Sequence, residues 1–181
     1  STLCFGTIEL VTHMPHRVVS IQKPWTTRTY RDCETKMKTE YGPSILIGKF
    51  IRNGNATDKT RLFADFSANI QNCVLKHITL ANDEQPLVLF FDNEHLWLLV
   101  TTHGINWKND GLHYLHFIDI QSIEIDLKKN ANFFKSKEKG YYKFLIAQTT
   151  DGRVYELEIE PDKGFNGLYN VLTGCALSHR R

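Results

Sequence analysis

The hydrophobic pattern of this chain changes its period at Pro86, and this change constrains the fold more than any other feature. Before Pro86, apolar side chains recur at helical spacing over about residues 58–79. After it, short apolar runs are separated by turn signals such as Asp110-Gly111, which suits a tight hairpin. The second half of the chain is therefore predicted to be an antiparallel sheet.

The segment Val154–Glu160 shows the alternation most clearly. Its apolar side chains, Tyr155, Leu157 and Ile159, occupy every second position, and three glutamates occupy the positions between them. Successive side chains of a strand point to opposite faces, so this segment predicts one buried face and one solvated face.

An amphipathic segment follows the last predicted strand. Its apolar residues fall on one face of a helix: Phe165, Leu168, Tyr169, Leu172, Cys175 and Ala176. The predicted fold class is therefore α+β, with a curled antiparallel sheet or small barrel closed by a C-terminal helix.

The chain divides by pattern into two parts, which we predict to be an α/β N-terminal extension, 1–80, and a barrel with its helix, 81–181. The extension is expected to pack on the barrel and to hold one amphipathic helix, over about 58–79. We expect a strand at Ser44–Ile51 and a turn at Asn53-Gly-Asn55. Residues 7–11 and 17–22 resemble short strands, and residues 30–41 a short helix.

Several short motifs occur in an informative order: Phe91-Asp92, Val100-Thr-Thr-His-Gly-Ile105, Ile118-Asp-Ile120, Thr150-Asp-Gly-Arg153 and Leu168-Tyr-Asn-Val-Leu172. Together they resemble the bacterial pleckstrin-homology-like domains, over about residues 81–177. The resemblance implies a small barrel with a terminal helix. It also implies a module that binds lipid, peptide or protein, without naming the ligand.

Composition and charge restrict the function further. The net charge of +2 is too small to favour nucleic acid as a partner. The four cysteines form no CxxC pair, which argues against a zinc ribbon and favours reduced thiols in a cytoplasmic protein. Because the sequence shows no long apolar run, we expect neither a membrane-spanning segment nor a signal peptide.

Candidate catalytic and metal-binding residues each have a plainer interpretation. His113 and His116 are three apart on a predicted strand and would face opposite sides, whereas His13 and His16 flank a turn where they could converge. Cys73 and His77 are four residues apart on the predicted helix and would lie on the same face. They are either two side chains packed in the core or a nucleophilic thiol with its base. We expect no metal, cofactor or enzymatic activity, and keep an enzyme with an unrecognised site as the alternative.

Two surface features are candidate binding sites. The first is the predicted loop 128–140, whose phenylalanines could insert into a membrane while its lysines bind phosphate. Its candidate residues are Lys128, Lys129, Phe133, Phe134, Lys135, Lys137 and Lys139. The second is an acidic strand face formed by Glu156, Glu158 and Glu160.

These features predict a non-enzymatic binding module whose partner is a protein that it regulates or inhibits, as an immunity-type protein does. A peripheral binder of anionic membranes, acting through 128–140, is the alternative.

Overall fold

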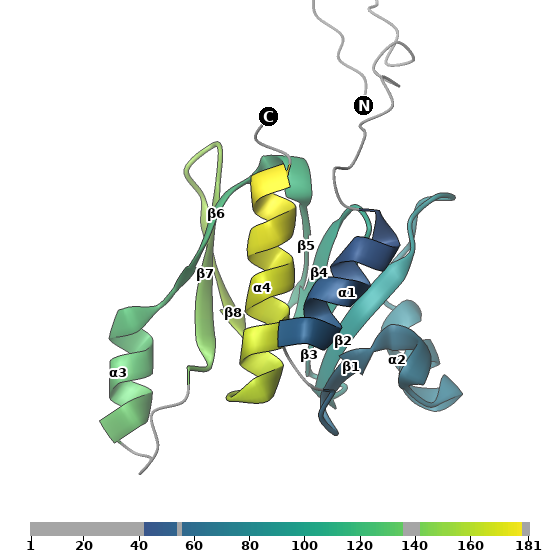
Figure 1. Ribbon diagram of the computed structural model, residues 1–181, viewed down its shortest axis with the longest axis horizontal. Coiled ribbons are helices and arrows are strands. Elements are labelled where there is room, and N and C mark those ends of the chain that lie inside the picture. The colour runs from purple at the N-terminus through teal and green to yellow at the C-terminus, as the bar shows by residue number, and fades with distance from the viewer. Residues whose placement is uncertain (1–41, 54–55, 136–141, 179–181) are drawn as a thin grey trace, which may run out of the picture. The chain divides into compact units, whose positions relative to one another are not determined.

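The computed structural model describes residues 42–53, 56–135 and 142–178, all within one unit, Lys38–Arg181 (Figure 1). The side chains at 53, 132–135 and 178 are outside this description. The expected elements at 7–11, 17–22 and 30–41 lie outside the described residues, as does most of the Asn53-Gly-Asn55 turn.

Five antiparallel strands form the larger sheet, in the order of the chain: β1 (Thr60–Leu62), β2 (Pro86–Asn93), β3 (Leu96–Thr101), β4 (Gly104–Lys108) and β5 (Leu112–His116). Tight turns join the consecutive strands from β2 through β5, as the turn residues predict. The short β1 forms one edge and β5 the other. Because β1 pairs with β2, residues on both sides of position 80 share this sheet. The boundary at 80/81 stays a prediction.

Three further antiparallel strands form a second sheet: β6 (Ile120–Ile125), β7 (Phe144–Thr149) and β8 (Val154–Glu158). The alternation predicted for β8 is confirmed, because Leu157 and Ile159 are fully buried. The fold is α+β, as predicted. The C-terminal helix is also confirmed, as α4 (Lys163–Ser178).

The prediction of a closed barrel is wrong for the described residues, whose strands form two separate hydrogen-bonded sheets. The chain leaves the first sheet through a 3-10 turn, η3 (Phe117–Asp119). The imidazole Nδ1 of His116 accepts a hydrogen bond from the backbone N–H of Ile118 there, 3.2 Å away. This turn redirects the chain, so that β6 starts a new sheet instead of pairing with β5.

The predicted strand Ser44–Ile51 is instead part of a helix, α1 (Pro43–Asn53). A short apolar run does not by itself distinguish a strand from a buried helix. Leu46 and Phe50, four residues apart, are buried in the core where α1 packs against α4. Pro43 suits the first helical position because its missing N–H has no helical partner to lose.

The single helix expected over 58–79 is also wrong. The segment forms β1, the 3-10 turn η2 (Phe63–Asp65) and a shorter helix, α2 (Ala68–Leu75). The side chain of Gln71 closes the turn, because its Nε2 donates to the carbonyl oxygens of Phe63 (3.1 Å) and Phe66 (2.8 Å). Phe63, Phe66, Ile70 and Val74 still share one core, but a turn and a helix present them together.

The five-stranded sheet has two faces with separate cores. Its inner face packs against α1, α4 and the second sheet through Val88, Phe90, Leu98, Val100 and Ile105. Its outer face packs against η2 and α2 through Leu89, Trp97 and Leu99. The outer core is much the smaller of the two.

The predicted loop 128–140 is helical in its first half, as α3 (Leu127–Lys135). Asn130 is fully buried and holds the helix to β7. Its Nδ2 donates to the carbonyl oxygens of Asp126 (2.6 Å) and Phe144 (2.8 Å), and its Oδ1 accepts from the backbone N–H groups of Lys143 (2.7 Å) and Phe144 (3.1 Å). A fully satisfied buried amide of this kind fixes the start of α3.

No helix in the described ranges is long and apolar enough to cross a lipid bilayer.

Candidate functional site

The glutamates of the acidic strand face each have a partner close by. Glu156 forms an ion pair with Lys129 of α3, and Glu158 pairs with Lys143 at 2.5 Å. Glu160 lies beyond the end of β8 and accepts a hydrogen bond from Thr57. Each of the three carboxylates therefore has a partner within the fold, and their role as a binding face stays a prediction.

The lysine and phenylalanine candidates are only partly described. Lys128 is exposed on α3, and Lys129 is half-buried beside Glu156. Phe133, Phe134 and Lys135 lie on α3 with side chains outside the described part, and Lys137 and Lys139 fall outside it altogether. Binding to anionic membranes through 128–140 stays a prediction.

Of the two histidine pairs considered in the sequence, only His113 and His116 are described, and their side chains do not converge. His113 stacks on Trp107, with ring centroids 5.0 Å apart, whereas the ring of His116 lies 6.0 Å from that of His103. His13 and His16 are outside the described residues. Across the ranges that are described, no group of three or more histidine, cysteine, aspartate or glutamate side chains is placed to hold a metal ion.

Cys73 and His77 do not share a helical face, because α2 ends at Leu75. His77 stacks on Trp97 instead. Burial, followed by the charges of Lys108 and Lys76, lowers the pKa of its imidazole. At α4, burial raises the pKa of the Cys175 thiol to about 12, so this cysteine is a packed thiol at neutral pH.

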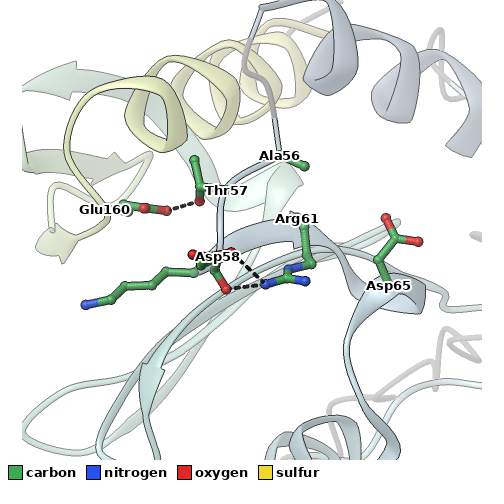
Figure 2. A pocket seen from close by; sticks show the side chains of 7 residues that line it. Ala56, Thr57, Asp58, Arg61, Asp65 and Glu160 are labelled. Carbon is green, nitrogen blue, oxygen red and sulfur yellow. Dashed lines mark hydrogen bonds and ion pairs between the residues drawn. The ribbon is translucent and has the colours of Figure 1, made fainter.

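A charged pocket of about 690 Å³ opens beside β1 (Figure 2). Its lining residues are Ala56, Thr57, Asp58, Lys59, Arg61, Asp65 and Glu160. Its two cations are already engaged. Lys59 pairs with Asp92, and Arg61 donates to the Asp58 carbonyl oxygen at 2.5 Å and stacks over Phe66.

This pocket has a structural role at the start of α4. A Cβ atom built on Gly164 would lie 2.7 Å from the Glu160 Oε2 atom and 2.9 Å from the Thr60 Oγ1 atom. The Glu160 carboxylate therefore lies against the first turn of α4, where a negative charge is favourable. Together with the hydrogen bond from Thr57, this contact ties the segment before β1 to the closing helix.

A second cavity, which we call the β5 groove, lies on the outer face of the five-stranded sheet and has a volume of about 510 Å³. One wall is the connection from α2 to β2, residues 77–81 with Glu84. The other wall and the floor come from β4 and β5, through Asn106, Leu112, His113 and Tyr114. Leu112 and His113 point to opposite faces of β5, so the groove reaches the open edge of the sheet.

The register shows which backbone groups face that edge. The N–H of Phe117 donates to the carbonyl oxygen of His103, and that of Asn109 to the carbonyl oxygen of Gly111. In an antiparallel ladder the hydrogen-bonded pairs alternate, so His113 and Leu115 bond to β4, whereas Leu112 and Tyr114 direct their N–H and C=O groups outward. These outward groups have no backbone partner among the described residues.

Apolar side chains accompany these unpaired groups. Leu112 is 49% exposed, Tyr114 is 50% exposed and Ile118, just beyond the strand, is 47% exposed. Burial, followed by the charges of Glu84 and Asp119, raises the pKa of the Tyr114 phenol to about 12. The phenol is therefore neutral at physiological pH and can donate a hydrogen bond.

Two features position this wall. Glu84 is held by hydrogen bonds from the Thr101 hydroxyl (2.5 Å) and from the backbone N–H of Ala81 (3.1 Å). Gly104 lies under the Tyr114 ring, where a Cβ atom would be 3.1 Å from Tyr114 Cε2 and 2.4 Å from the Leu115 carbonyl oxygen. Only glycine fits this close approach of β4 to β5.

Asn106 forms the polar floor of the groove. It is only 6% exposed, and within the described part of the chain its side chain makes no hydrogen bond. The sequence analysis missed the groove entirely. The available signal was an asparagine within an otherwise apolar strand, where asparagine is depleted.

Comparison with protein-family models, curated proteins and solved structures finds no match for this chain. The fold and the groove themselves define its class: an α+β protein of two antiparallel sheets, with an open groove at one sheet edge.

Proposed function

We propose that this chain is a non-enzymatic binding module that takes an extended segment of a protein partner along β5. The observation that carries the proposal is the outer edge of β5, where the backbone groups of Leu112 and Tyr114 have no backbone partner among the described residues and lie beside a groove. An extended peptide satisfies such groups by adding a strand to the sheet, and its alternate side chains enter the neighbouring pocket.

The two edges of the sheet differ in a way that supports the proposal. Edge strands are commonly protected by being short or by carrying charges. β1 fits that description, because it has three residues and its Arg61 is flanked by Lys59. β5 has five residues, with neither lysine nor proline, and it exposes Leu112 and Tyr114. An unprotected edge of this kind suits pairing with another chain.

The resemblance to bacterial pleckstrin-homology-like domains supports the same class of function, since it implies a module that binds lipid, peptide or protein. A succession of antiparallel strands followed by a terminal helix agrees with it. In this proposal the module regulates or inhibits its partner, as an immunity-type protein does, by occupying the segment that it binds.

The test is selection of a phage-displayed random-peptide library on the immobilised full chain. Peptides enriched on the unmodified protein are then assayed against a double variant, Leu112→Asp with Tyr114→Asp. The matched control is Val154→Asp, which changes an apolar residue on β8 that is also largely exposed. The proposal predicts peptides that bind the unmodified protein and the control but not the double variant.

Failure to enrich any peptide, or enrichment of peptides that bind all three proteins equally, would contradict the proposal. Circular dichroism of each variant shows whether it is folded. If the double variant does not fold, Leu112→Asp alone replaces it.

A further inference from the structure

The floor of the β5 groove contains a polar side chain that the fold itself does not use. Asn106 lies at the middle of the outer face, opposite Leu99 of β3 on one side and Tyr114 of β5 on the other. Only 6% of its surface is exposed, yet its carboxamide forms no hydrogen bond with any described residue. The small exposed fraction opens into the groove that the residue lines.

Asn130 shows what a structural asparagine does in this chain. It is also buried, but its carboxamide takes part in four hydrogen bonds to backbone groups, which anchor α3 to β7. Buried polar groups in proteins are nearly always paired in this way, and an exception calls for an explanation. The carboxamide of Asn106 is instead open to the groove that the residue lines, where water or a ligand can pair with it.

The chemistry of the carboxamide limits what that ligand can be. It presents one carbonyl acceptor and one N–H₂ donor side by side. Water in the groove can satisfy both groups in the unbound protein. A ligand that displaces this water must supply both a donor and an acceptor, or leave a polar group unpaired at a cost in affinity. A primary carboxamide presents both on the same side of one planar unit, whereas the N–H and C=O of a trans peptide bond point in opposite directions.

The charges around Asn106 favour a neutral group of this kind. Glu84 lines the groove beside Tyr114, and Lys108, outside the lining, has its Nζ atom 3.5 Å from the Nε2 atom of the lining residue His77. The groove therefore has an acidic residue in its wall and a positive charge close to His77. A neutral dipole avoids repulsion by both, whereas a single charge is opposed by one of them.

We propose that Asn106 determines the specificity of the β5 groove, where its carboxamide forms paired hydrogen bonds with the carboxamide of an asparagine or glutamine side chain of the bound segment. The inference rests on the proposed function, because it takes the occupant to be a polypeptide segment. A single main-chain amide can form only one of the two hydrogen bonds at a time.

Small probes test the inference directly on the isotope-labelled full chain by NMR. N-methylacetamide represents the main-chain amide, and propionamide represents a side-chain carboxamide. Methyl acetate has a similar size but lacks the N–H donor. We expect propionamide to shift the Asn106 side-chain resonances and to bind about fivefold to tenfold more tightly than methyl acetate, the effect of one hydrogen bond.

Two variants complete the design. Asn106→Leu retains the volume and removes both hydrogen-bonding groups, so the preference for the amide over the ester should disappear. Asn72→Leu is the control, because Asn72 is exposed on α2 and away from the groove lining. It should keep the preference. The comparison of probes on the unmodified protein remains decisive if Asn106→Leu does not fold.

Each outcome has a definite meaning. Tighter binding of propionamide than of the other two probes supports a side-chain carboxamide, and binding of N-methylacetamide that is as tight or tighter overturns it. Equal binding of propionamide and the ester, or an unchanged preference in Asn106→Leu, overturns the inference. If selected peptides bind Asn106→Leu as well as the unmodified protein, this inference fails while the proposed function stands. If propionamide binds but no peptide is selected, the polypeptide occupant is overturned together with the proposed function, and only the amide preference of Asn106 stands.

Discussion

The two faces of the five-stranded sheet differ in what covers them. On the inner face, the strand positions at the centre of the sheet are apolar and buried against α1 and α4. They include Val88 on β2, Val100 on β3 and Ile105 on β4. On the outer face, α2 and η2 cover β2 and β3 but leave β4 and β5 beside an open groove. On this outer face lies Asn106, a buried residue whose carboxamide makes no hydrogen bond within the described part of the chain.

This difference separates stability from recognition within one sheet. The inner face provides most of the apolar burial that stabilises the fold. The outer face of β4 and β5 contributes less, and its exposed apolar side chains and unpaired polar groups are features that favour binding. Substitutions on the two faces should therefore have different consequences.

The largest contrast is expected between Leu98 and Leu112. Leu98→Ala on the inner face should lower the free energy of unfolding by about 2–5 kcal/mol, because it removes a buried side chain and leaves a cavity. Leu112→Ala, at a half-exposed position, should change it by less than about 0.5 kcal/mol. Urea denaturation measures both. Equal losses would remove the distinction between the faces.

Gly104→Ala should disturb the groove through the backbone. The new Cβ atom would lie 2.4 Å from the Leu115 carbonyl oxygen, so β4 and β5 must move apart. We expect a loss of about 1–3 kcal/mol in the free energy of unfolding. Gly48→Ala is the control, because nothing lies within 4 Å of its Cβ position. Thermal denaturation that shows the same loss in both variants would contradict the close approach at Gly104.

Asn106→Leu should leave the protein as stable as before, or raise the free energy of unfolding by up to about 1 kcal/mol, because no internal hydrogen bond is lost. Asn130→Leu is the matched comparison. Breaking its hydrogen bonds leaves buried backbone groups unpaired and should cost more than about 2 kcal/mol. Denaturant titration measures both variants. If they lose similar amounts of stability, Asn106 has a structural role like that of Asn130.

The smallest effect is expected at the protected edge of the sheet, from the Lys59–Asp92 ion pair. The hydrogen bond from Lys59 lowers the pKa of the Asp92 carboxyl group, despite the opposing effect of burial. A depressed folded-state pKa contributes stability above the unfolded-state pKa of about 3.9, and this is lost as pH falls through the folded value. The hydrogen bond from the same pair raises the pKa of Lys59, so the matching contribution is lost only at strongly alkaline pH.

Lys59→Met should therefore reduce stability at pH 7 and flatten its decline below about pH 4. The expected loss is under about 1 kcal/mol, because solvent screens a largely exposed pair. Thermal denaturation across this pH range measures it. If stability below about pH 4 declines as steeply in Lys59→Met as in the unmodified protein, the pair contributes nothing to stability.

Residue spacing within one segment predicts the elements whose form does not depend on packing against distant segments. The alternation at 154–160 and the apolar stripe of α4 depend only on residue spacing, and both predictions are confirmed. The strand predicted at 44–51 is wrong because the choice of helix is made by packing against α4, which lies far along the chain. The closed barrel is wrong because the pairing of β5 with β6 depends on the direction of the η3 turn, which no periodicity encodes.

The groove was beyond sequence reasoning for a similar reason. Asn106, Tyr114 and Glu84 come together only through the register of β4 with β5 and the path of the connection from α2 to β2. The candidates chosen from sequence were charged or aromatic clusters in single segments. Glu156 and Glu158, the clearest of them, form ion pairs within the fold.

The most direct test of the account is an NMR shift map of the full chain with a peptide enriched by library selection. The account predicts that the largest changes fall on the backbone amides of Leu112 and Tyr114 and on the side-chain amide of Asn106. Changes confined to α3 or to the charged pocket around Glu160, with β5 undisturbed, would contradict it.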